Sequence, residues 1–235
     1  MNLHRPHLGD EARKLAYFGY YKYLFGRDLP LAAELASTVR GWERAAKARD
    51  SPVSKDVWEE QYRSGKWDYM KEVGQLARYS VIVGYLEFFA KGGMILDVGS
   101  GEGILEEHLS AGRFGGCLGV DLSEEAIARA EARTVDRAAE HISFVCADVE
   151  RYVPKGPYDA VVFNEILYYL DDPLASSARY VDCLAPDGVF IVSLYGVSAR
   201  ANAIRRRLDE TYRVVDQVRT SNGPNAWVCS VYQPR

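Results

Sequence analysis

The stretch that most constrains the fold is residues 94–103, an apolar run that leads directly into a turn with glycine at every second position. Ile104, Leu105 and Leu109 follow at helical spacing, so a helix should begin near Gly103. Glycine lets the backbone turn tightly and approach a ligand where a Cβ would clash, and a helix start offers unpaired N–H groups at the positive end of the helix dipole. The sequence therefore predicts a nucleotide-binding corner, although its glycine spacing differs from the dinucleotide pattern GxGxxG.

Three further apolar runs each end in polar side chains. The second run ends in Asp121, about twenty residues beyond the turn, where α/β nucleotide folds place the acid that binds ribose hydroxyls. The third run leads into Asp148, and the fourth leads into Asn164 and Glu165. Because ligands bind at the carboxyl ends of the strands in open parallel sheets, we expect these side chains to share one site.

Four motifs occur in the order found in class I S-adenosylmethionine-dependent methyltransferases. Residues 97–103 resemble the first motif of that family, residues 119–123 its ribose motif and residues 147–149 its adenine motif. Residues 184–192 resemble its late L-x-P-G-G turn and strand, with Asp187 in place of the first glycine. The ordered set is far more specific than any one motif.

The resemblance covers about residues 55 to 235 and implies an α/β fold. We expect a Rossmann-like, doubly wound, seven-stranded sheet whose last strand is antiparallel, within a methyltransferase domain at residues 71–235. Residues 1–70 would form an N-terminal helical extension or lid. The implied cofactor is S-adenosyl-L-methionine, and the implied product is S-adenosyl-L-homocysteine.

The resemblance also assigns residues to the cofactor. Asp121 would accept both ribose hydroxyls, and Asp148 would accept from the adenine amino group, with a helix cap as its alternative role. Arg78 would lie near the cofactor carboxylate, where an arginine fork binds well, but an exposed helix arginine is equally common. The full set of expected cofactor residues is Trp67, Arg78, Asp97, Gly99, Gly101, Gly103, Asp121, Leu122, Asp148, Val149 and Asn164.

The expected catalytic residues are Glu165, Tyr168 and Tyr169, which follow the fourth apolar run. An oxygen acceptor needs a general base, whereas a neutral amine needs mainly a correctly aimed lone pair. Glu165 is the carboxylate best placed to act as that base, and the tyrosines could position the acceptor or bracket the sulfonium by cation–π contact. The alternative is that Glu165 caps local backbone and the tyrosines pack beneath the N-terminal helices.

The N-terminal residues are rich in aromatic side chains from Tyr17 to Phe25, which suggests helices that pack on the main domain, cover the substrate or form a dimer surface. Trp58 and Tyr62 lie four residues apart on one helix face. In related small-molecule methyltransferases, the segment that contains Trp67 crosses the mouth of the cofactor site.

Composition limits the classes of partner that the protein can bind. A formal charge of -4 argues against nucleic-acid and membrane-surface binding. We see no signal peptide, no apolar run of ~20 residues and no metal-ligand spacing, and four unpaired-looking cysteines favour a reduced, cytoplasmic protein. We expect a small-molecule acceptor and a monomer or a homodimer formed through the N-terminal helices.

The most favoured function is methyl transfer to the hydroxyl or amine of a sugar or secondary metabolite. The run from Asn164 to Leu170 is similar to that of methyltransferases acting on small metabolites, including the N-methyltransferases of nodulation-factor synthesis. The alternative is a catalytically silent, cofactor-binding subunit whose N-terminal helices form a partner interface. A nicotinamide-dependent oxidoreductase is disfavoured because it would carry GxGxxG.

Overall fold

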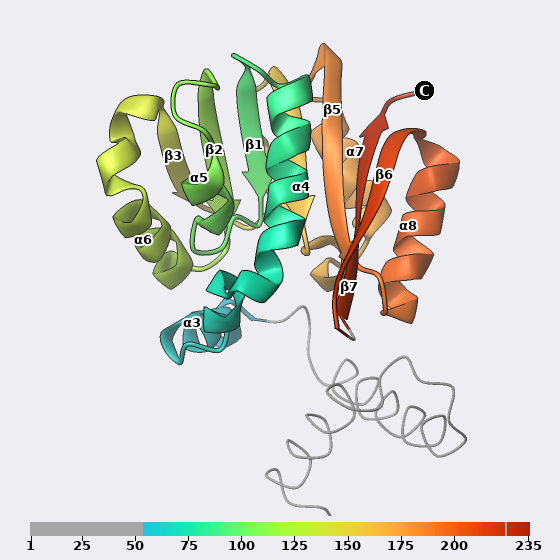
Figure 1. Ribbon diagram of the computed structural model, residues 1–235. Coiled ribbons are helices and arrows are strands. Elements are labelled where there is room, and N and C mark those ends of the chain that lie inside the picture. Colours follow the sequence, from blue (N-terminus) through green and yellow to red (C-terminus); the bar gives the residue numbers. More distant parts are fainter. Residues whose placement is uncertain (1–53, 224) are drawn as a thin grey trace, which may run out of the picture. The chain divides into compact units, whose positions relative to one another are not determined.

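The structure is a computed structural model, and it describes residues 54–223 and 225–235 (Figure 1). The helices and short 3-10 helices are α3 (Lys55–Arg63), η2 (Asp68–Lys71), α4 (Val73–Phe89), α5 (Ile104–His108), α6 (Glu124–Arg133), η3 (Val135–Glu140), η4 (Leu167–Tyr169), α7 (Pro173–Val181) and α8 (Ala199–Thr211). The strands are β1 (Met94–Val98), β2 (Gly116–Asp121), β3 (Ile142–Cys146), β4 (Tyr158–Asn164), β5 (Leu184–Tyr195), β6 (Arg213–Asn222) and β7 (Asn225–Gln233).

The strands form one seven-stranded sheet in the order β3-β2-β1-β4-β5-β7-β6. The pairs β1/β2, β2/β3, β1/β4 and β4/β5 are parallel, whereas β7 is antiparallel to both of its neighbours. The prediction of seven strands with an antiparallel last strand is therefore confirmed. The order reverses between β1 and β4, and ligands of open α/β sheets bind at such a switch point.

Alternate residues of the central strands face two separate cores. Ile95, Val162 and Ile191 face the side covered by α4 and α5. Leu96 and Phe190 face the opposite side, which α7 and α8 cover. A strand covered on both faces reads as an almost continuous apolar run, which explains why these strands stand out in the sequence.

The predicted N-terminal extension falls mainly on residues 1–53, which lie outside the described residues. The domain boundary at residue 70 therefore stays a prediction. Residues 54–70 form α3 and η2, and these contact α6 and α4 respectively. Figure 1 shows α3 at the end of the sheet to which the arrowheads of β1 and β2 point.

Candidate functional site

The glycine turn follows β1 and crosses the end of β2. Gly99, Gly101 and Gly103 have φ values of 77°, 56° and 72°, a left-handed conformation that L side chains rarely adopt. The N–H groups of Gly99 and Ser100 both donate to the carbonyl oxygen of Val120, at 2.7 and 3.1 Å. The turn is therefore fixed to β2, and α5 begins directly after it, as the sequence predicts.

Asp121 ends β2 and holds its carboxylate against this turn. Oδ2 accepts the N–H of Gly101 at 3.0 Å, and Oδ1 accepts the N–H of Ser123 at 3.0 Å. Burial raises the pKa of the Asp121 carboxyl, while these N–H groups and that of Leu122 act in the opposite direction. Since a carboxylate can accept about four hydrogen bonds, Asp121 retains acceptor capacity for a ligand.

Asp148 and Val149 follow β3 and lie beside Asp121. The N–H of Ala147 donates to the carbonyl of Asp121 at 2.8 Å, which brings the two strand ends together. Oδ1 of Asp148 accepts the N–H of Glu150 at 2.9 Å, so this side chain also caps the turn after β3. The local capping role is present, and the adenine role of Asp148 stays a prediction.

Arg78 is fully buried in α4, so the alternative of an exposed helix arginine is wrong. Nη1 donates to Oδ1 of Asn164 at 2.7 Å, and Nη2 donates to Oε1 of Gln75 at 3.1 Å. The guanidinium carbon lies 4.7 Å from the ring centroid of Tyr79 and 5.7 Å from that of Trp227. The structure thus brings Arg78 and Asn164 together at the end of β4.

Five buried polar atoms around this corner lack a hydrogen-bond partner among the described residues. They are Nε of Arg78, Oδ1 of Asp97, Oγ of Ser100, Nε1 of Trp67 and Oε2 of Glu106. Leaving a buried donor or acceptor unpaired costs about 1–3 kcal/mol, so such groups point to a ligand with complementary polar atoms. The set contains donors and acceptors, which fits a ligand that carries both a carboxylate and an ammonium group.

Asp97 and Glu106 form a buried acidic pair beneath the glycine turn, and the sequence analysis did not find Glu106. Both side chains are almost completely inaccessible. Burial and the neighbouring carboxyl raise the pKa of Asp97 well above its usual range, and burial raises the pKa of Glu106. The sequence carried one signal for this role: Glu106 directly follows the apolar residues Ile104 and Leu105 in a short helix.

Glutamine at position 106 should make the protein more stable at alkaline pH. Because the folded pKa of Glu106 is raised from 4.5 to about 7, the folded state retains a proton that the unfolded chain releases. The free energy of unfolding of the protein must then fall as the pH rises from about 4.5 to about 7, and it stays low at higher pH. Glu106→Gln removes this loss and should add up to about 3 kcal/mol at pH 8, measured by urea unfolding at pH 5 and pH 8.

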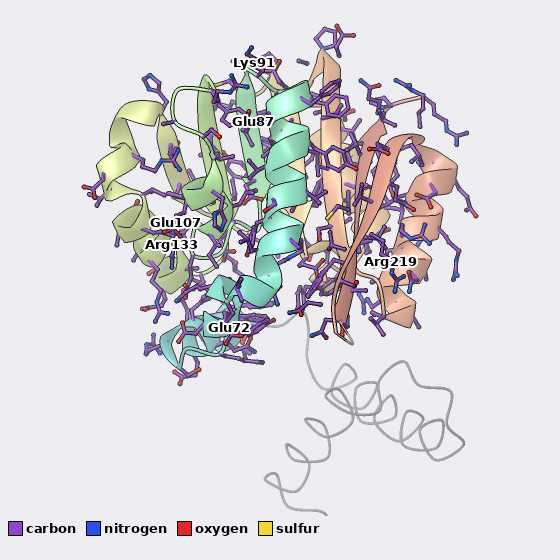
Figure 2. The ribbon with its side chains drawn as sticks, in the orientation of Figure 1. Glu72, Glu87, Lys91, Glu107, Arg133 and Arg219 are labelled. Carbon is purple, nitrogen blue, oxygen red and sulfur yellow. The ribbon has the colours of Figure 1, made fainter. Side chains whose placement is uncertain are left out.

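Glu107→Gln is the matched control, since Glu107 is the exposed neighbour that pairs with Arg133 at 2.9 Å (Figure 2). It should change stability by less than about 1 kcal/mol at either pH. Equal behaviour of the two variants would contradict the assignment of a retained proton to the buried pair.

Glu165 follows β4 with φ of 63°, which is unusual for a residue with a side chain. Tyr168 Oη donates to Oε2 at 2.8 Å, and Ser193 Oγ donates to Oε1 at 2.9 Å. Burial raises the pKa of the Glu165 carboxyl, while the charge of Arg78 and the two hydroxyls act in the opposite direction. The ring of Tyr169 lies 4.7 Å from that of Tyr168, so the three predicted catalytic residues are neighbours in space.

Aromatic side chains of α3 and η2 gather over the same end of the sheet. Trp58 stacks on Trp67 with ring centroids 5.8 Å apart and meets Tyr169 edge-on at 5.1 Å. A Cβ added to Gly101 would lie 3.0 Å from Oη of Tyr62. The segment that contains Trp67 therefore covers the glycine turn and borders the predicted catalytic residues.

Glu59 anchors this segment to α6. Its carboxylate accepts the N–H of Glu124 at 2.7 Å, the N–H of Glu125 at 3.0 Å and the hydroxyl of Ser123 at 2.8 Å. A carboxylate at a helix start satisfies unpaired N–H groups and opposes the helix dipole. Ser123 caps the same helix by accepting the N–H of Ala126, but nothing in the local sequence could reveal that Glu59 completes the cap.

Glu102 anchors the segment at its other end. This side chain belongs to the glycine turn, is buried, and pairs with Lys71 at 2.8 Å, Arg129 at 2.8 Å and Arg133 at 3.4 Å. Three cations around one buried carboxylate offset the cost of removing it from water. The glycine turn, η2 and α6 are thereby tied together.

The structure holds few other candidate sites. Among residues 54–223 and 225–235, no group of three or more His, Cys, Asp or Glu side chains could hold a metal ion. No helix in this part of the chain is long and apolar enough to cross a bilayer.

Comparison with known proteins gives one family match. A family model described as "Methyltransferase domain" matches residues 38–228. The ubiquinone biosynthesis O-methyltransferase of Neisseria meningitidis serogroup C is 26% identical over 148 residues, which cover 62% of this chain and 60% of that protein. Nodulation protein S of Rhizobium fredii is 35% identical over 86 residues, 34% of this chain and 47% of that protein.

The solved structures include close matches in fold. The N-methyltransferase NodS of Bradyrhizobium japonicum WM9, in complex with S-adenosyl-L-homocysteine, aligns with a TM-score of 0.62 and 21% identity over 72% of this chain and 91% of that one. At this identity the likeness concerns the fold alone. The matched regions span 60% or less of the two curated relatives named above.

Proposed function

The chain belongs to the methyltransferase-domain family, and from this we propose that it is an S-adenosylmethionine-dependent methyltransferase acting on a small molecule. The acceptor group is a hydroxyl or amine of a sugar or secondary metabolite. The observation that carries the proposal is the carboxylate of Asp121, bonded at 3.0 Å to the N–H of Gly101 within the glycine turn. This arrangement joins the ribose-binding acid to the turn that a nucleoside would cross.

The cofactor would lie along the carboxyl ends of β1, β2 and β3. Asp121 receives the ribose hydroxyls, and Leu122 lies next to it in the chain. Asp148 and the N–H of Val149 receive the adenine edge. Their position beside Asp121 supports this assignment, because adenine and ribose are joined directly.

The methionine end of the cofactor would lie near β4. Arg78 and Asn164 receive its carboxylate, and Asp97 lies near its ammonium group. The unpaired Nε of Arg78 supports this orientation, because it needs an acceptor. Trp67 covers this end, while Gly99, Gly101 and Gly103 leave room for the chain between the two ends.

Bound S-adenosylmethionine supplies an electrophilic methyl group, and the protein supplies position and a dry environment. Glu165 holds its carboxylate between Tyr168 and Ser193 and can take a proton from an acceptor hydroxyl. An amine acceptor would use the same carboxylate to orient its N–H. Tyr168 and Tyr169 position the acceptor, and the aromatic cluster of α3 and η2 keeps water away.

Thermal unfolding with S-adenosylhomocysteine tests this function first. A ligand at a hundred times its dissociation constant adds about 2.7 kcal/mol if it binds only the native state, which should raise the midpoint by roughly 5–10 °C for a chain of this size. NADH should give no shift. Asp121→Asn, which keeps the shape but loses the charge, should reduce the shift because neutral hydrogen bonds are about half as strong as charge-assisted ones.

Turnover provides the second arm of the test. Methyl transfer from S-adenosylmethionine is measured against a panel of amino sugars, sugars and phenols. A shift with NADH but none with S-adenosylhomocysteine would overturn the proposal. Binding without any turnover would instead favour a silent cofactor-binding subunit.

A further inference from the structure

Helix α4 exposes a face of small and apolar side chains. Among its 17 residues only Arg78 and Glu87 carry charge: Arg78 is buried, and Glu87 is partly exposed at the edge of this face, where it pairs with Arg113. A surface helix normally turns charged residues toward solvent, and a contiguous apolar patch indicates an interaction site. The exposed positions of α4 are Val73, Leu76, Ala77, Ser80, Gly84 and Phe88.

This face is distinct from the face that packs on the sheet. Tyr79, Ile82 and Leu86 are buried in the core beneath α4, whereas Val73 and Phe88 are 85% and 80% exposed. Figure 1 shows α4 lying across the near side of the sheet, with its outer surface toward the viewer. Phe88 lies at one end of this face and Val73 and Leu76 lie at the other, and all three side chains gain from being covered.

A hollow and a projecting ring occur on the same helix. The hollow has a volume of about 350 Å³ and is lined by Ser80, Val83, Gly84, Glu87 and His108. A Cβ added to Gly84 would meet nothing within 4 Å, so the backbone is open there. Phe88 projects one turn beyond Gly84, near the end of the helix.

The charges at the ends of α4 favour an antiparallel arrangement. Glu72 lies at the start of α4 and Lys91 lies just beyond its end, and both are exposed (Figure 2). An antiparallel copy crossing level with Ile82 would set Gly84 opposite Ser80 and Phe88 opposite Leu76. The same crossing brings Lys91 of one copy close to Glu72 of the other, whereas a parallel copy would place like charges together.

We propose that the chain forms a two-fold symmetric homodimer in which the exposed faces of two α4 helices pack antiparallel. In such an interface the same surface serves both subunits. Phe88 is the apolar anchor, the Ser80–Gly84 notch permits close approach of the helices, and the two Glu72–Lys91 pairs fix the direction. The predicted cofactor site lies at the carboxyl ends of the strands, and Arg78 belongs to it from the buried side of α4, opposite the proposed interface.

Sedimentation of the full chain over a wide range of concentration tests this dimer. The wild-type chain should show a concentration-dependent dimer, and Phe88→Glu should raise its dissociation constant about thirtyfold or more, as expected when an apolar anchor is replaced by a charge. Val153→Glu is the matched control, because Val153 is 81% exposed outside α4. It should leave the dimer intact, and S-adenosylhomocysteine binding should report that all variants fold.

A charge-swap cycle tests the orientation. Glu72→Lys and Lys91→Glu should each weaken the dimer by about threefold or more, and the double variant should recover it, since opposite charges face each other again. A wild-type chain that is monomeric at every concentration would overturn the proposal and mean that another part of the chain or another protein covers the face. A dimer that Phe88→Glu leaves unchanged would overturn it as well.

Discussion

Glutamine in place of Arg78 should weaken S-adenosylhomocysteine binding by about 10- to 100-fold and leave 5′-methylthioadenosine binding unchanged. The expected loss follows from removing a charge-assisted hydrogen bond to the ligand carboxylate, worth about 1.5–3 kcal/mol. Methylthioadenosine keeps the adenine and ribose of the cofactor but lacks its amino-acid end. Isothermal titration of both ligands against the same variant therefore separates a lost carboxylate contact from a damaged fold.

Arg113→Gln is the control for this experiment. Arg113 pairs with Glu87 at 2.9 Å on the protein surface, away from the strand ends that form the site, and its loss should alter neither affinity. If Arg78→Gln weakened both ligands equally, Arg78 would support the site as a whole rather than bind the carboxylate.

Alanine at Gly103 should destabilise the protein by about 3 kcal/mol or more, the range of overpacked and strained core positions. The added Cβ would lie 2.9 Å from Cβ and 3.0 Å from Cα of Ala130, and 3.2 Å from Cζ of Phe144. Ala130 belongs to α6, so its Cα and Cβ cannot move away without shifting the helix. The left-handed φ of 72° adds strain.

Gly112→Ala isolates the packing contribution. Gly112 has a similar φ of 67°, but a Cβ there would meet nothing within 4 Å. It should cost only about 1–2 kcal/mol, the penalty for the left-handed backbone itself. Urea unfolding of both variants measures the difference, and equal costs would contradict a tight contact between the turn and α6.

The fold was predictable because its signals are local. Each buried strand is an apolar run in the sequence, and β6 and β7 pair as neighbours in the chain, antiparallel to each other. The motif at residues 97–103 predicted where the first strand ends and where α5 begins. The family match confirms the resemblance. The contact between Asp121 and Gly101 follows from the same topology, because neighbouring parallel strands end side by side.

The parts of the site that the sequence did not reveal depend on distant contacts. Glu59 caps a helix that begins more than sixty residues later in the chain, and its own surroundings look like an ordinary charged helix. Glu102 occupies a variable-looking position between two glycines, yet it receives three cations from other elements. Arg78 and Tyr62 needed the packed structure to show that one is buried and the other covers the turn.

The two anchors of the segment from α3 to η2 have a kinetic consequence. Glu59 holds one end to α6 and Lys71 holds the other to Glu102, so release of either contact leaves the segment attached. A segment tethered in this way opens as a hinged flap. Its opening rate is a property of the protein and does not depend on the ligand concentration. If ligand exchange passes beneath Tyr62 and Trp67, the observed rate of association would reach a plateau at high ligand concentration, set by how often one anchor lets go.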